Sequence, residues 1–245
     1  MKLPTKVLAV LGFALLAQGC AAGNLADLTI YDRTEGKRLP VYWHGGRAYV
    51  AGKPGNEYQV SIRSRLGEDL LAVVSVDGVN AVTGQTADAS QSGYVLSPSG
   101  SVDIQGWRKS LSETAAFYFT SLGDSYAART GRPENVGVIG VALFRRKQEP
   151  HPLGFSENRR EAASDAASGA RSPAAESQLG TGHGRRETSH ATTVAFERAT
   201  VTPAEILTVY YDSRASLVAR GIIRQPVPMA PLPRPFPGFV PDPQG

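Results

Sequence analysis

The chain contains very little sulfur. Its 245 residues include one cysteine, Cys20, and two methionines. A single cysteine cannot form an intramolecular disulfide, and it cannot supply the sets of thiolates that structural zinc sites and iron–sulfur clusters require. The sequence therefore predicts a fold without disulfides, and it predicts no metal and no cofactor.

The sequence also lacks an apolar run long enough to cross a bilayer, which takes roughly 20 residues in a helix. The apolar run 7–17 follows Lys2 and Lys6 and precedes Gln18-Gly19-Cys20. A positive segment, a short apolar segment and then small residues are the order of a secretory signal peptide. We expect residues 1–19 to be removed and the remaining chain to be exported.

The segment Leu16-Ala17-Gln18-Gly19-Cys20 resembles the lipobox of bacterial lipoproteins, although that family more often has leucine where this chain has Ala17. The resemblance implies that Cys20 is acylated and that residues 20–27 form a lipidated tether. Ala21, where an aspartate would signal retention, implies an outer-membrane lipoprotein that faces the periplasm. The alternative is an ordinary signal peptide cut near an unmodified Cys20, whose thiol would be open to intermolecular pairing.

Neither sign of charge dominates. The formal net charge is +4, and it falls to +2 when Lys2 and Lys6 are removed with the signal peptide. A nucleic-acid-binding domain carries a basic stripe with aromatic residues among it, which this sequence does not show. Export also separates the protein from the genome, so nucleic acid is excluded as a partner.

Short strands separated by turns fill residues 28–146, which we interpret as one domain. Residues 57–63 alternate between apolar and polar side chains, as a strand with one wet face does. A hairpin with residues 70–76 is the simplest interpretation, and Asp77-Gly78 marks the next turn. About eight short strands without a clear helix favour an antiparallel β-sandwich.

Two further segments carry clear structural signals. Residues 136–144 are apolar on both parities, which predicts a central strand covered on both faces, with Gly137 and Gly140 admitting close neighbours. Trp43-His44-Gly45-Gly46 predicts a hairpin tip.

The rest of the chain divides by composition. Residues 147–178, rich in alanine, serine, glutamate, glycine and arginine, predict a disordered linker. Residues 179–224 predict a small C-terminal β/α unit docked on the sandwich. We expect strands near 194–196 and over 206–211, followed by a helix 214–220 capped by Asp212 or Ser213. A helix that begins at Pro203 is the alternative. Eight prolines predict an extended tail over residues 225–245.

Six segments of the ordered parts carry distinctive glycine-, aromatic- and asparagine-containing stretches, and they are Ser75–Asn80, Gly93–Leu96, Gly106–Lys109, Gly131–Gly140, Leu179–Gly184 and Tyr211–Ser213. Together they resemble an uncharacterised family of proteobacterial secreted proteins. The resemblance covers most of both ordered parts. It supports the domain plan and implies no activity.

The glycine-rich segment 180–186 has two interpretations. Backbone N–H groups and guanidiniums of Gly182, His183, Gly184, Arg185 and Arg186 would suit an anion-binding loop. The segment lacks the ending of a phosphate-binding P-loop, and the favoured interpretation is the flexible end of the linker. His183 and His190, with Glu187 between them, match no standard zinc spacing.

A ligand-binding rim is the second candidate site. Tyr94, Trp107 and Arg108, with Asp77 and Asn80 from a polar loop, would stack on and hydrogen-bond to a sugar or peptide. The favoured alternative places Trp107 in the core with Arg108 solvated.

No catalytic residue emerges from the sequence. Neither G-x-S-x-G nor H-E-x-x-H occurs. Carboxylates for glycoside hydrolysis would have to come from Asp77, Asp103, Glu113 or Asp124, among which spacing does not choose.

We therefore expect a non-catalytic cell-envelope lipoprotein that is held on the membrane by lipid at Cys20 and binds a glycan, a peptide or an envelope protein. The alternatives are a hydrolase of cell-wall or surface polysaccharide, and a structural or assembly factor that acts through the proline-rich tail.

Overall fold

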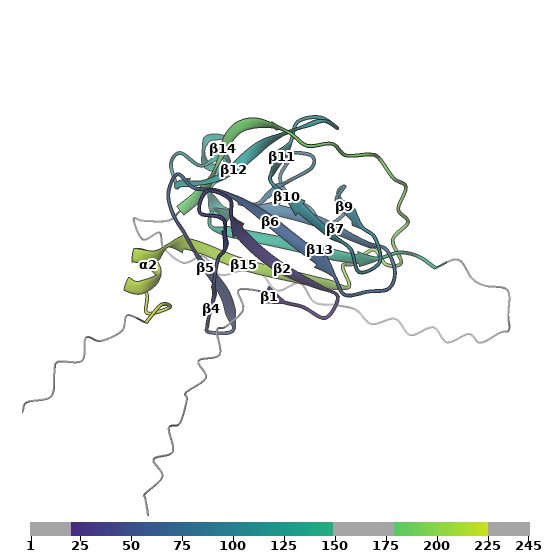
Figure 1. Ribbon diagram of the computed structural model, residues 1–245, viewed down its shortest axis with the longest axis horizontal. Helices are drawn as coiled ribbons and strands as arrows, with labels where there is room; N and C mark the ends of the chain where they lie inside the picture. The colour runs from purple at the N-terminus through teal and green to yellow at the C-terminus, as the bar shows by residue number, and fades with distance from the viewer. Residues whose placement is uncertain (1–20, 149–178, 225–245) are drawn as a thin grey trace, which may run out of the picture.

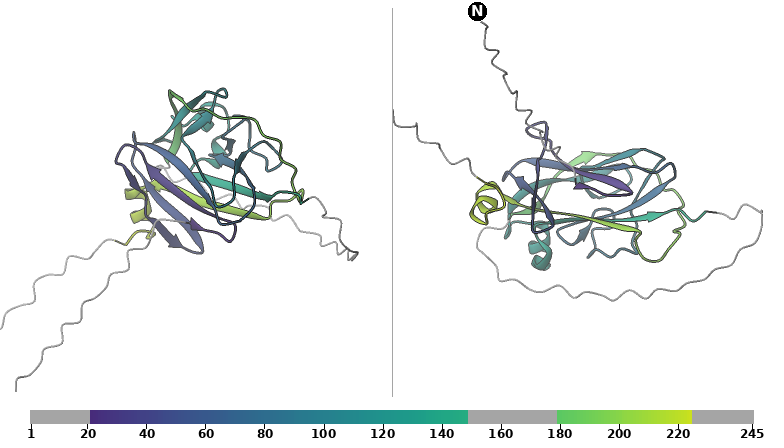
Figure 2. Two further views of the ribbon diagram at one scale, coloured as in Figure 1. Left: turned by 45° about the vertical axis from the view of Figure 1, so that its right-hand side comes forward. Right: turned by 90° about the horizontal axis from the view of Figure 1, so that it is seen from below.

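A computed structural model describes residues 21–148 and 179–224 of the chain. Within these residues the protein is mainly β, with two sheets in two layers and two short α-helices, α1 (Tyr126–Arg129) and α2 (Arg214–Ala219) (Figure 1). The right-hand view of Figure 2 shows the layers from the side. The predicted signal peptide, Cys20, most of the predicted linker and the proline-rich tail lie outside the described residues.

The first sheet is antiparallel. Its order is β1-β2-β6-β12-β11, and β3, β10 and β14 pair with β2, β6 and β12 respectively. Its strands are β1 (Ala21–Ala22), β2 (Ala26–Asp32), β3 (Lys37–Arg38), β6 (Glu57–Ser64), β10 (Ser101–Ile104), β11 (Gly106–Arg108), β12 (Glu113–Ser121) and β14 (Leu179–Thr188).

The second sheet is mixed. Its order is β4-β5-β15-β13-β7-β8, with β9 paired to β7, and β15 runs parallel to β5. The prediction of an entirely antiparallel fold is wrong at this pair, because β15 comes from a distant part of the chain and no hairpin turn sets its direction. The strands are β4 (Val41–His44), β5 (Arg47–Gly52), β7 (Leu70–Val76), β8 (Val79–Asn80), β9 (Tyr94–Leu96), β13 (Val138–Arg145) and β15 (Glu205–Ser213).

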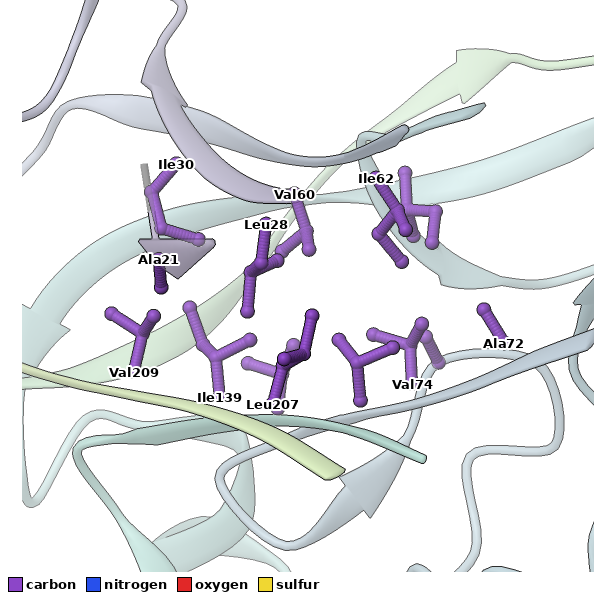
Figure 3. Close-up of a cluster of buried hydrophobic side chains, with 14 of the residues drawn as sticks. Ala21, Leu28, Ile30, Val60, Ile62, Ala72, Val74, Ile139, Leu207 and Val209 are labelled. Carbon is purple, nitrogen blue, oxygen red and sulfur yellow. The ribbon is translucent and has the colours of Figure 1, made fainter. Parts of the chain in front are cut away.

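The main core lies between the two sheets. Leu28 and Ile30 of β2 alternate with outward-facing residues, and in Figure 3 they face Ile139 and Val209 of the second sheet. Tyr58, Trp107, Phe117 and Phe119 add large buried side chains from the first sheet. Burial of this apolar surface, worth about 25 cal/mol per Å², holds the two layers together.

The sequence predicts that residues 179–224 form a separate unit docked on the sandwich, and this prediction is wrong. β14 pairs with β12 along the first sheet, and β15 lies between β5 and β13 in the second. Leu207, Val209 and Tyr211 of β15 belong to the main core. Each sheet is therefore completed by a strand that follows the predicted linker.

The predicted hairpin of residues 57–63 with 70–76 is also wrong, because β6 and β7 belong to different sheets. β6 alternates between inward apolar and outward polar residues, whereas β7 is buried along almost its whole length. Leu71 and Val73 point away from the main core and pack against Phe144 in a second apolar cluster. A strand covered on both faces fits the second sheet, whose outer face is overlaid by other segments.

The segment 189–204 runs across that outer face without the strand predicted at 194–196 or the helix proposed from Pro203. Phe196 packs on the cluster of Leu71 and Phe144. Arg198 stacks on the Phe144 ring at 4.2 Å and donates hydrogen bonds to the carbonyls of Ala89 and Ser90. Side-chain contacts and separate backbone hydrogen bonds, such as that from the Ala199 N–H to the Arg145 carbonyl, hold this segment in place of a strand ladder.

The first described residues are not a free tether. Ala21 and Ala22 form β1 and pair with Leu28 and Asp27, and Ala21 and Ala26 are buried. The prediction that residues 20–27 form a tether is therefore wrong for residues 21–27, because small apolar side chains there fit the edge of the core.

Local signals located several other features correctly. β13 is central, between β15 and β7, and Asp77 and Gly78 form the turn between β7 and β8 with φ of 53° and 72°. Ser213 caps the helix α2 (Arg214–Ala219) by accepting a hydrogen bond from the Ser216 N–H. Gly140 differs from expectation, since no atom lies within 4 Å of the position a Cβ would take.

Candidate functional site

The outer face of the first sheet carries a regular set of polar side chains, here called the polar array. Its members come from four adjacent strands, and they are Asp27, Thr29, Tyr31, Arg38, Gln59, Ser61, Arg63, Ser101 and Asp103. The register places Thr29, Ser61 and Asp103 in one row. Rows lie about 7 Å apart along the strands and neighbours about 5 Å apart across them.

The array lines an open depression of about 690 Å³, to which Ala22, Ile62 and Arg65 also contribute. Because the sheet is covered on its inner face by the core, every second residue of β2, β6 and β10 must point outward. The alternating pattern of the sequence therefore builds this surface directly.

Part of the array is internally bonded and part is not. Gln59 donates to Ser61, and Ser61 donates to the Asp103 carboxylate at 2.6 Å. Asp27 pairs with Arg65 at 2.6 Å. Both Arg38 and Arg63 take part in the strand ladders through their backbones, but across the two described ranges, 21–148 and 179–224, the side chain of neither has a hydrogen-bond or ion-pair partner. Two guanidiniums are thus free to bind a ligand.

The predicted rim around Trp107 does not exist as a surface. Trp107 is 1% exposed and packs edge-on against Phe117, so it cannot stack on a ligand. Asp77 and Asn80 are fully buried. Arg108 lies 5.9 Å from the Tyr94 ring, but its guanidinium is held by the carbonyl and hydroxyl of Ser189.

Asp77 instead forms the centre of a buried hydrogen-bond network. Its carboxylate accepts bonds from the Thr181 N–H at 2.7 Å, the Gly137 N–H at 3.0 Å and the Tyr211 hydroxyl at 2.5 Å. The Thr181 hydroxyl contacts the hydroxyls of Tyr211 and Tyr58 at 2.6 and 2.5 Å. Burial raises the pKa of Asp77 to about 6 and the pKa of both tyrosines well above the ordinary value.

The glycine-rich segment is neither an anion-binding loop nor the flexible end of a linker; it is strand β14. Its glycines make room for neighbours, since a Cβ on Gly182 would lie 2.1 Å from the Tyr118 ring and one on Gly180 would lie 2.5 Å from Ser125. The paired strand commits its backbone to the ladder with β12. Close packing, and not anion binding, therefore accounts for the glycine pattern.

The charged residues of β14 already have partners. Arg185 binds Glu57 through two bonds of 2.8 and 3.0 Å, and Arg33 binds Glu187 through two of the same lengths. Arg186 pairs with Glu113. These contacts leave no free pair of guanidiniums for the predicted anion site.

His183 lies against the rings of Trp107 and Tyr126, and desolvation lowers its pKa. It is not joined by Glu187, whose carboxylate binds arginine. No group of three or more histidine, cysteine, aspartate or glutamate side chains suited to a metal occurs among the described residues.

The four carboxylates considered for hydrolysis have separate surroundings. Asp77 is buried, Asp103 lies in the polar array, Glu113 pairs with Arg186, and Asp124 accepts from Ser121. The structure does not bring them together around one cleft. Only Asp103 belongs to the candidate site.

Comparisons with protein-family models, with curated proteins and with solved structures found no match to this chain. No helix in the described part of the chain has the length and apolar character needed to span a bilayer.

The sequence alone does not single out the polar array, because alternating polar residues are also typical of a solvated strand face. The unpartnered Arg38 and Arg63 become visible only when the register is known.

Gly182→Ala is expected to lower the free energy of unfolding by about 1–3 kcal/mol, because its Cβ would collide with Tyr118. Chemical denaturation followed by circular dichroism measures the effect. Gly140→Ala, in an open strand position, is the matched control and should cost nothing. Adding Tyr118→Ala should recover much of the loss at Gly182; equal stability of the Gly182 and Gly140 variants would contradict the packing explanation.

The raised pKa of Asp77 predicts a stability that falls as the pH rises. The folded protein holds this proton until about pH 6, whereas the unfolded chain releases it near pH 3.8. The contribution of Asp77 protonation to the free energy of unfolding is complete below about pH 4 and is lost by about pH 6. The change is about 3 kcal/mol for a shift of about two pKa units. Denaturation of the wild type and of Asp77→Asn between pH 4 and pH 7 tests this. As the pH rises, the wild type should lose stability relative to the variant, because asparagine does not titrate. A difference independent of pH would refute it.

Proposed function

We propose that this protein is an exported, non-catalytic lipoprotein of the bacterial cell envelope, built on a β-sandwich, that binds a glycan through the polar array. The observation that carries the proposal is the array itself. It combines hydroxyl, amide, carboxylate and unpartnered guanidinium groups in fixed rows around one open depression.

The chemistry of the array suits a ligand rich in hydroxyl groups. Arg38 and Arg63 offer donors only, while Asp27 and Asp103 offer acceptors. Tyr31 contributes an aromatic ring with a polar tip, on which the apolar face of a sugar ring can stack. Apart from Ala22 and Ile62, every residue that lines the depression has a polar or charged side chain, so a ligand there is held mainly by hydrogen bonds.

The location of the array favours a glycan over a peptide added as an extra strand. Such a peptide needs an unpaired strand edge, and its affinity comes from main-chain bonds. The array lies on a sheet face, where recognition depends on side chains. Its two carboxylates already hold Arg65 and Ser61, an arrangement that supports binding better than bond cleavage.

Arg63→Ala and Tyr31→Ala are each expected to weaken binding of soluble peptidoglycan fragments about tenfold, since a hydrogen bond to a charged group contributes about 1.5–3 kcal/mol. Isothermal titration calorimetry measures the affinity. Arg129→Ala, an exposed arginine on α1 (Tyr126–Arg129), is the matched control and should bind as the wild type does. Unchanged binding in both array variants would sink the proposal, and release of new reducing ends would favour a hydrolase.

Cys20→Ser is expected to abolish acylation and the cleavage that depends on it. Metabolic labelling with a radioactive fatty acid and fractionation of the cells test this. Two acyl chains anchor a protein stably, so the variant should leave the membrane fraction or keep its signal peptide. A variant that still reaches the mature size and stays membrane-bound would contradict the lipoprotein assignment.

A further inference from the structure

The hairpin formed by β4 and β5 ends in an exposed tryptophan. Trp43 is 61% exposed, whereas the other tryptophan of the chain, Trp107, is buried. Trp43 pairs with Ala48 next to the Gly45-Gly46 turn. Keeping so large an apolar side chain in water is unfavourable, which makes this position a candidate for contact with another phase or partner.

Three arginines lie beside the same hairpin on the outer face of the second sheet, each against a tyrosine of the cluster there. Trp43 comes from the other face, opposite Ala48 of the main core. Arg47 lies 5.6 Å from the Tyr210 ring, and Arg220 lies 5.6 Å from the Tyr49 ring. A hydrogen bond of 3.4 Å joins Arg214 to the Tyr42 hydroxyl. We call these six residues, together with Trp43, the hairpin end.

The hairpin end is strongly basic. All three arginines are exposed, and only Arg220 pairs with a carboxylate, that of Asp212 at 3.5 Å. The other two guanidiniums are uncompensated within the described residues. An anionic surface is the complementary partner.

The described chain begins beside this end. Figure 3 shows Ala21 facing Val209 across the core, and Val209 pairs with Ala48, which pairs with Trp43. Two strand spacings place the Trp43 backbone about 10 Å from that of Val209. In Figure 1, the β4–β5 hairpin lies at the lower left with α2 beside it, and β1 lies to the right of β4. The described chain therefore begins at the same end of the molecule as the hairpin that carries Trp43.

We propose that the hairpin end is a membrane-contact surface, in which Trp43 enters the interface of an anionic bilayer while Arg47, Arg214 and Arg220 bind the headgroups. Tryptophan is the side chain most favoured at membrane interfaces, because its ring is apolar and its N–H is polar. Guanidiniums bind phosphate through paired hydrogen bonds. The choice of a bilayer as the partner rests on the lipid anchor proposed for Cys20, because that anchor brings this end of the molecule to a membrane.

The test uses the unacylated chain, residues 20–245 carrying Cys20→Ser, mixed with vesicles of phosphatidylcholine with or without phosphatidylglycerol. Because Trp107 is buried, a change in tryptophan emission reports on Trp43. We expect a shift to shorter wavelength and protection from acrylamide quenching with phosphatidylglycerol vesicles, and little change with phosphatidylcholine alone. Added salt should reverse the shift.

Arg47→Gln should lower the partition coefficient about fivefold, because each basic residue near an anionic surface contributes about 1 kcal/mol. Vesicle sedimentation measures this coefficient, and Arg129→Gln is the matched control. Trp43→Phe should remove the emission change while the Trp107 signal remains. Absence of binding to anionic vesicles, or equal binding of the Arg47 variant and the wild type, would overturn the proposal. Since the protein tested carries no lipid, this outcome is independent of whether Cys20 is acylated.

Discussion

The buried carboxylate of Asp77 is the interaction on which both sheets depend. It accepts hydrogen bonds from Thr181 and Tyr211, which lie 104 and 134 residues further along the chain. Burying a carboxylate is costly unless its oxygens are satisfied, and here three donors satisfy them. The network joins the turn after β7 to β14 of one sheet and β15 of the other, so strands that follow the predicted linker are fixed to strands that precede it.

Both proposed surfaces follow from that junction. β14 carries Arg185 and Glu187, which bind Glu57 and Arg33. These two partners lie side by side at the end of β2 that carries Tyr31, so β14 supports that end of the polar array. β15 pairs with β5 and thereby holds the hairpin that carries Trp43. The two surfaces lie on different sheets, yet each is held in place by a strand that Asp77 fastens.

Features set by a few neighbouring residues could be predicted from the sequence, and features set by distant contacts could not. The alternation of β6, the Asp77-Gly78 turn and the Ser213 cap depend on local conformation, and the sequence located them correctly. The sheet to which β7 belongs depends on Phe144 and Phe196, far along the chain. The predictions for the glycines of β14, an anion-binding loop or a flexible linker end, are also wrong because of a distant contact. Only the fold shows that Tyr118 lies across from Gly182.

Because residues 21–27 belong to the folded domain, the lipid proposed for Cys20 would lie close to the polar array. Ala22 belongs to β1 and lines the same depression as the polar array. One residue, Ala21, separates it from Cys20, so the two Cα atoms are at most about 7 Å apart. A lipid on Cys20 would therefore hold one edge of the array almost at the bilayer surface, with no extended linker to let the domain reach outward. A glycan bound there would itself have to approach the membrane, which favours envelope material next to the bilayer over polymers deeper in the periplasm. The hairpin that carries Trp43 and Arg47 would orient the domain for that contact.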